Sequence, residues 1–196
     1  MSTQDKTLTP DEYLEIERKA EFRSEYYQGE MFAMERGTGA HTELVDNLVC
    51  CLLLKLRGGP CRAYSTNMRV QVSATGLYTY PDLVVACGDG RFLDARHDTL
   101  LNPVVIIEVL SDSTEAYYRG KKFAHFRTLE SLQEYVLVSQ DRVLVECYKR
   151  QPGDRWLLTE ASGPEQTITL DSVGGSLSLA DIYEGVEVSS EPRKAV

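Results

Sequence analysis

One stretch of the chain constrains its fold more than any other: an unbroken run of apolar, largely β-branched residues. The run covers residues 103–110, and Glu108 is its only charged member. A strand with one face in solvent alternates apolar and polar residues, whereas a strand covered on both faces does not. The run therefore predicts a central strand of a sheet packed on both sides, with one carboxylate inside it.

Helices are expected on either side of this strand. Thr9, Pro10 and Glu12 form a capping-box pattern that predicts a helix through about residue 19. Apolar residues at helical spacing over 44–56 predict a second helix, which the Gly-Gly-Pro at 58–60 ends. Cap residues at 111–114 predict a third helix near 117–130, and residues 179–183 a closing helical turn.

Further strands are expected where β-formers stand between turn signals. They cover residues 29–34, 62–72, 80–86, 134–138, 142–148, 155–160 and 167–170. This order predicts one α/β (α+β) domain over residues 1–188, with a mixed sheet flanked by helices and additional antiparallel strands. Residues 189–196 are expected to form a polar, disordered tail, because they hold too little apolar surface to fold.

The charge balance limits the kinds of partner. The 196 residues include 21 Lys and Arg against 30 Asp and Glu, giving a formal net charge of −9. That balance excludes a protein that holds polyanions through its overall field, so any nucleic-acid contact must be local. The charge reverses locally between residues 111 and 127, where four basic residues outnumber two acids. The basic residues are Arg119, Lys121, Lys122 and Arg127.

The cysteines and the hydropathy pattern bear on location. Five cysteines are an odd number without a C-x-x-C pair, which suggests neither a zinc knuckle nor a disulfide framework. We therefore expect buried free thiols in a reducing cytoplasm. The first residues form no apolar signal segment, and no run reaches the ~18 apolar residues that a membrane span needs. We expect a cytoplasmic protein with no membrane contact.

Two acids on neighbouring predicted strands carry the strongest chemical signal. Asp82 starts one strand and Glu108 lies near the end of the other, so the two carboxylates can share one divalent cation. Mg²⁺ prefers oxygen ligands and keeps several waters, which makes two carboxylates and the carbonyl of Val109 a sufficient set. Lys122, on the following helix, is the candidate to orient or deprotonate the attacking water.

Each of these residues also has a structural interpretation. Asp82 follows a proline and could simply be a turn residue at the start of a strand. Glu108 could be a buried acid paired with an arginine. Lys122 and its neighbours could form a solvated helix face.

Six features in chain order resemble a known family. They are the segments EYYQGE (25–30), YPDLVV (80–85), PVVIIEVLSDST (103–114), RGKK (119–122) and EYVLV (134–138), together with His41 at the start of the first long helix. The pattern resembles the bacterial putative restriction endonucleases, a branch of the PD-(D/E)XK nuclease superfamily, from about residue 9 to 185. The resemblance implies a restriction endonuclease-like core, Asp82 and Glu108 as magnesium ligands, and hydrolysis of DNA phosphodiesters.

The chain departs from the superfamily pattern near the second acid. Leu110 replaces the lysine expected two residues after Glu108, and the family moves that lysine to Lys122 on the next helix. Tyr118 stands where relatives often carry an aspartate, and Ser139-Gln140 replaces an acidic strand ending.

Further residues are candidates for supporting roles in such a site. His41 and Glu43 are accessory candidates at the start of the first long helix, where Asp46 also lies. Polar residues on a helix face, without chemistry, are the competing interpretation. Arg119, Lys121 and Arg127 are candidates for phosphate contact.

The leading hypothesis is a Mg²⁺-dependent DNA endonuclease, with Mn²⁺ as a substitute metal. One alternative is a catalytically inactive nuclease-derived domain that binds a nucleic acid or a protein partner, and another is a metal-dependent hydrolase of a different phosphoester. A homodimer is expected for duplex cleavage, since two antiparallel strands need two sites related by a two-fold axis. Phe92 and Leu93 are candidate exposed residues for that interface.

Overall fold

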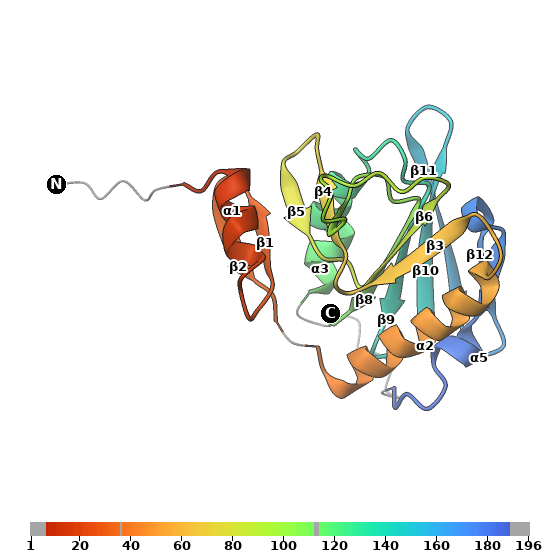
Figure 1. Cartoon of the computed structure of the whole chain (residues 1–196). Helices are drawn as coiled ribbons and strands as arrows, with labels where there is room; N and C mark the ends of the chain where they lie inside the picture. Colours follow the sequence, from red (N-terminus) through yellow and green to blue (C-terminus); the bar gives the residue numbers. More distant parts are fainter. Residues whose placement is uncertain (1–6, 36, 112–113, 189–196) are drawn as a thin grey trace.

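The computed structural model describes residues 7–35, 37–111 and 114–188 (Figure 1). The first half contains α1 (Pro10–Glu17), β1 (Ser24–Tyr27), β2 (Glu30–Ala33), α2 (Gly39–Leu56), β3 (Cys61–Ser65), β4 (Arg69–Val72), β5 (Leu77–Thr79), β6 (Leu83–Cys87) and β7 (Thr99–Leu100). The second half contains β8 (Val105–Leu110), α3 (Glu115–Tyr117), the π-helical turn η1 (Tyr118–Lys122), α4 (Phe123–Phe126), β9 (Glu134–Ser139), β10 (Leu144–Gln151), β11 (Arg155–Ser162), β12 (Thr167–Leu170), the 3₁₀ turn η2 (Asp171–Val173), β13 (Gly175–Ser178) and α5 (Leu179–Ile182).

The larger sheet has the strand order β11-β10-β9-β8-β6-β3 within the described residues. Strands β8 and β9 run parallel, and the other neighbours are antiparallel. All six residues of β8 are buried. The predicted central strand, covered on both faces, is therefore confirmed, and the fold is a mixed sheet flanked by helices as expected.

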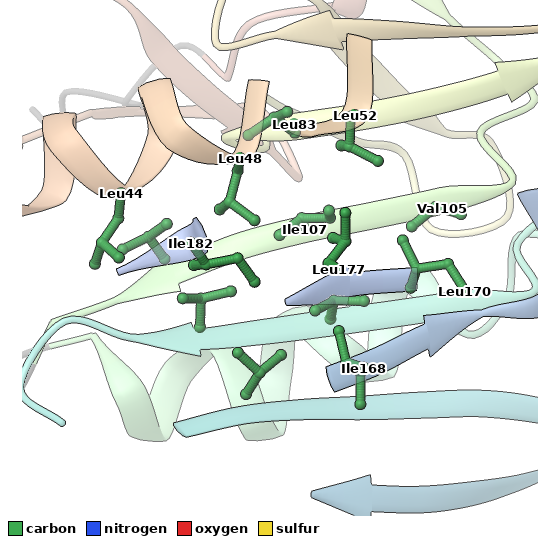
Figure 2. Close-up of a cluster of buried hydrophobic side chains, with 14 of the residues drawn as sticks. Leu44, Leu48, Leu52, Leu83, Val105, Ile107, Ile168, Leu170, Leu177 and Ile182 are labelled. Carbon is green, nitrogen blue, oxygen red and sulfur yellow. The ribbon is translucent and has the colours of Figure 1, made fainter. Parts of the chain in front are cut away.

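Helix α2 covers one face of this sheet, as Figure 1 shows. Its buried leucines Leu44, Leu48 and Leu52 share one apolar cluster with Leu83 and Ile107 of the strands below (Figure 2). The C-terminal hairpin β12–β13 and α5 complete the cluster with Ile168, Leu170, Leu177 and Ile182. Each such side chain contributes about 1.5–3 kcal/mol through burial, so this layer anchors the fold.

The other face of the sheet packs on the helical segment that follows β8. Phe126 and Tyr135 are fully buried there, with Val84, Ile106 and Leu137. A smaller sheet lies beside this layer, with the order β2-β1-β5-β4-β7. Helix α1 packs against this smaller sheet through Tyr13, which stacks on Tyr26 of β1 with ring centroids 4.9 Å apart. The predicted capping box of α1 is present at Thr9 and Glu12.

Several predicted elements differ from those observed. The strand predicted over 62–72 is two strands, because the chain turns after Ser65 and β4 pairs in the other sheet. The strand predicted over 29–34 is the second arm of a hairpin, whose turn has positive φ at Gln28 and Gly29. The third helix is shorter than predicted, since it ends at Phe126 and contains the π-helical turn.

The expectation of five free thiols was wrong. Cys61 and Cys87 form a disulfide, and the antiparallel register of β3 and β6 places them directly opposite each other. That register joins residues 26 positions apart, so spacing alone could not reveal it. Cys147 is buried, Cys51 is half-buried and Cys50 is exposed.

Other expectations concern the surface and the ends of the chain. Phe92 and Leu93 are half-buried rather than exposed, and the ring of Phe92 stacks on His97 with centroids 4.6 Å apart. They are therefore poor candidates for a dimer interface. The tail at 189–196 lies outside the described residues, as do 112–113 of the predicted cap. Within the described chain, no helix is long and apolar enough to span a membrane.

Candidate metal centre

The pairing of β6 with β8 brings the two predicted acids together. Leu83 is paired with Ile107, so Asp82 and Glu108 lie at the next position of the same antiparallel ladder. The backbone amide of Asp82 lies 3.4 Å from Glu108 Oε2, to which it donates. The amide of Val109 donates to Asp82 Oδ2 at 2.8 Å. Two carboxylates thus lie side by side at the edge of a rigid, fully buried strand.

Lys122 reaches this pair from the helical segment. Its Nζ lies 3.0 Å from Glu108 Oε1 and 3.1 Å from Glu25 Oε1, and the side chain is 1% exposed. It closes the π-helical turn, a helix type that is rare and frequent at functional sites. The interpretation of Lys122 as part of a solvated helix face was therefore wrong. Glu108 is a buried, paired acid, but its partner is a lysine rather than an arginine.

Glu25 is a third carboxylate that the sequence reasoning did not assign to the site. It lies on β1 and accepts hydrogen bonds from Thr79 Oγ1 and, at 3.3 Å, from Tyr117 Oη. Burial alone would raise the pKa of Glu25, but the charge of Lys122 and these hydrogen bonds lower it below its ordinary value. The available signal was its place in the EYYQGE segment, which was interpreted only as a family motif.

The charges around Glu108 do not balance. Lys122 contacts Glu25 and Glu108, while Asp82 contacts His41, so three carboxylates face one ammonium group and one imidazole. Burial raises the pKa of Glu108 to about 8, and Asp82 and Glu25 oppose the lowering effect of Lys122. Glu108 Oε1 lies 3.0 Å from the Lys122 ammonium, while Glu108 Oε2 accepts from the amide of Asp82. A divalent cation would supply positive charge beside these three carboxylates.

The donor set suits a hard cation with few protein ligands. Carboxylate oxygens and a backbone carbonyl are what Mg²⁺ prefers, with water completing its coordination. No group of three or more His, Cys, Asp and Glu side chains with metal-binding geometry occurs in the described ranges. The residues present fit a magnesium site built from Asp82, Glu108 and the carbonyl of Val109, rather than a closed zinc-type cage.

His41 contacts the acid pair from α2. Its Nε2 lies 3.1 Å from Asp82 Oδ1, and Thr38 caps the helix through the amide of His41. Burial alone would lower the pKa of His41, but the hydrogen bond and the charge of Asp82 raise it above its ordinary value. Glu43 and Asp46 are both exposed, but only Asp46 lines the cavity beside His41.

A cleft opens at this point, with two lobes of about 610 Å³ and 410 Å³. Met34, Glu35, Gly37, His41 and Asp82 line both lobes, so the lobes meet at the contact between His41 and Asp82. Val109, Tyr117 and Tyr118 line the smaller lobe only. The acid pair is therefore accessible through Asp82, while Glu108 and Lys122 lie beneath it.

The predicted phosphate-contacting residues are not gathered here. Arg119 forms ion pairs with Glu115 and Glu146, while Lys121 and Arg127 are exposed. None of the three lines either lobe. The excess of positive charge in residues 111–127 is thus not available as one basic surface, because Arg119 is engaged in ion pairs and Lys122 is buried.

Comparisons with known proteins place the chain in a family. A family model described as a putative restriction endonuclease, Uma2, matches residues 10–181. Two uncharacterized proteins of Synechocystis sp. are similar: one is 33% identical over 91% of this chain and 93% of its own length, the other 34% over 83% and 92%.

A solved structure is also similar. It is a putative nuclease belonging to DUF820 from Anabaena variabilis, which matches with a TM-score of 0.74 and 20% identity over 90% of this chain and 97% of its own. At that identity the likeness concerns the fold alone. Together with the family match, it leads to one conclusion: the chain belongs to the Uma2 family of putative restriction endonucleases.

Proposed function

We propose that this protein is a magnesium-dependent endonuclease that hydrolyses phosphodiester bonds in DNA. One observation carries the proposal: Asp82, just before β6, and Glu108 on β8 lie side by side, and together with Glu25 they face a single ammonium group, that of Lys122. Family membership and a nuclease fold support it.

Asp82, Glu108 and the carbonyl of Val109 would hold the cation, with Mn²⁺ as a substitute. A bound divalent cation supplies Lewis-acid chemistry, offsetting the negative charge that develops on the phosphoryl oxygen. The amide of Val109 fixes Asp82 Oδ2, and His41 fixes Oδ1, so that this carboxylate enters the reaction already oriented. Such orientation lowers the reorganisation that the reaction needs.

Lys122 has a different role from the one expected of a base. Burial alone would lower its pKa, but Glu108, Tyr118 and Glu25 raise it well above the ordinary value, so the ammonium stays protonated. With Nζ held between two carboxylates, Lys122 positions Glu108 and stabilises its charge. We therefore assign Lys122 to orienting Glu108 rather than to deprotonating the attacking water.

The test combines metal binding with cleavage. Wild type, Asp82→Asn and Glu108→Gln are compared with Glu43→Gln, whose exposed carboxylate lies on α2 outside the cleft. Titration calorimetry with Mg²⁺ and Mn²⁺ should show binding by the wild type and the control only. DNA cleavage should follow the same pattern. Metal binding that survives in both site variants would contradict the proposal.

The other hypotheses remain distinguishable in the same experiment. Metal binding without cleavage of any DNA would favour a hydrolase of another phosphoester, and absence of both would favour a nuclease-derived binding domain. A homodimer is part of the proposal only for duplex substrates, because two antiparallel strands then need two sites. Light scattering on the wild type measures that state directly.

A further inference from the structure

Exposed aromatic side chains are not spread evenly over this protein. Eight large hydrophobic residues are exposed in the described chain, and three of them are aromatic: Phe22 at 57%, Phe32 at 48% and Tyr117 at 37%. All three line the cleft, whereas none of the five exposed aliphatic residues does. The aliphatic residues are Ile16, Leu53, Leu54, Leu157 and Leu158. Single exposed apolar residues are ordinary on a surface, but this sorting by type and place is not.

The aromatic residues flank the acid pair from two sides. Phe22 lines the larger lobe, while Phe32 and Tyr117 line the smaller one, and the lobes meet at His41 and Asp82. A chain that crossed the cleft with its reacting bond at Asp82 would therefore pass an aromatic ring on each side.

The charge of the cleft disfavours recognition through phosphates. Its lining contains Glu21, Glu25, Glu35, Asp46 and Asp82, against Arg23 and His41. A protein that follows duplex DNA contacts its phosphates with a row of lysines and arginines, and its affinity falls steeply with salt. Among the described residues this lining offers no such row, so the affinity must come from another part of the substrate.

We propose that the cleft takes single-stranded DNA and holds it by stacking unpaired bases on Phe22 in the larger lobe and on Phe32 and Tyr117 in the smaller lobe. This inference rests on the proposed nuclease function and specifies its substrate. Bases in a duplex are stacked on one another and cannot reach these rings, whereas every unpaired base presents a face to an aromatic side chain. A single strand also needs no second copy of the protein.

The test measures binding in EDTA, so that it does not depend on catalysis. A fluorescein-labelled 12-nucleotide strand is compared with its duplex and with the same strand carrying two central abasic sites. We expect the single strand to bind at least tenfold more tightly than either competitor. Phe22→Ala and Phe32→Ala should each raise the Kd about five- to hundredfold, in the range of stacking losses. Leu158→Ala, exposed on β11 and outside the cleft, should bind as the wild type does.

Two further readouts exclude a folding artefact and a phosphate-driven mode. Phe22→Trp and Phe32→Trp retain a stacking face and should keep wild-type affinity or exceed it. Because few phosphates are neutralised, the slope of log Kd against log salt should stay shallow, near that of one or two contacts. Equal or tighter binding of the duplex, wild-type affinity in both alanine variants, or no measurable binding of the single strand would each overturn the inference.

Cleavage in Mg²⁺ separates this inference from the proposed function. If the protein cleaves duplex DNA and neither phenylalanine substitution changes DNA binding, the proposed nuclease function is supported and the stacking site is contradicted. If binding of the single strand depends on the phenylalanines but no DNA is cleaved, the stacking site is supported and the proposed nuclease function is contradicted.

Discussion

Two glutamates, Glu17 and Glu108, are both buried, yet their surroundings differ. Glu17 accepts from the amide of Ser24 and the hydroxyl of Tyr80, both at 3.0 Å, and Tyr80 in turn accepts from Arg69. One buried acid thus shares a network with one buried arginine. Glu108 instead shares a single lysine with Glu25, beside Asp82.

The comparison teaches that burial of a carboxylate does not by itself mark a functional site. The Glu17 network joins α1 to β1 and to the segment before β6, and Glu17 lines neither lobe of the cleft. At Glu108 the excess of acids, rather than the burial, favours a cation. The predictions below are ordered by the size of the effect and test this difference.

The largest effect is expected from Lys122→Met. Removing one partner of a buried ion pair leaves an uncompensated charge and costs about 3–5 kcal/mol of unfolding free energy. Urea denaturation measures this loss. Lys121→Met, at the exposed neighbouring position, should change stability by less than about 0.5 kcal/mol. Adding Glu108→Gln to Lys122→Met should recover part of the lost stability. If the stability changes of the two single variants simply add in the double variant, Lys122 and Glu108 are not energetically coupled.

Magnesium should stabilise the folded protein by a smaller amount. A ligand that binds only the folded state adds about 2.7 kcal/mol at a hundredfold excess over its Kd. The Tm of the wild type and of Glu17→Gln should therefore rise with Mg²⁺, whereas that of Asp82→Asn should not. An equal rise in all three would place the cation elsewhere.

Glu108→Gln should change the stability of the metal-free protein by no more than about 1 kcal/mol, in the stabilising direction. The amide keeps the shape of the acid and cannot ionise, so Lys122 remains paired with Glu25. Thermal unfolding in EDTA measures the effect. A loss of several kcal/mol would mean that the Glu108 carboxylate is structural in the same way as Glu17.

The smallest effect concerns Arg18, which joins α1 to the loop before β7. Hydrogen bonds from Arg18 hold the pKa of Asp98 below its ordinary value. A lowered folded-state pKa stabilises the protein above the unfolded value near 4, and this contribution is lost as pH falls through the folded value. Asp98→Asn should therefore cost up to about 1 kcal/mol at pH 7 and less at pH 3, measured by denaturation at both pH values.

The sequence was sufficient where short-range pattern decides structure. The unbroken apolar run at 103–110 predicted β8 because only a strand covered on both faces tolerates it. Asp82 and Glu108 were paired correctly because strands that follow one another commonly lie together. The capping box of α1 and the apolar spacing of α2 likewise depend on residues within a few positions of one another.

The sequence was insufficient where contacts join distant residues. Glu25 lies far along the chain from Lys122 and meets it only because β1 pairs with β5 beside the helical segment. The burial of Lys122 depends on a π-helical turn, which no simple periodicity indicates. Glu43 and Asp46 differ by less than one helical turn, so choosing between them requires the rotation of α2 about its axis.

The disulfide at the far end of β6 affects how every one of these experiments is prepared. Residues Leu83–Cys87 separate Asp82 at one end of the strand from the covalent link to β3 at the other. Reducing agents, added routinely to protect thiols such as Cys50, also break the covalent link between β3 and β6 and leave only their hydrogen-bonded pairing. Thiol chemistry in the buffer is therefore an experimental variable, and two laboratories that differ only in their reductant would be measuring two covalently different proteins.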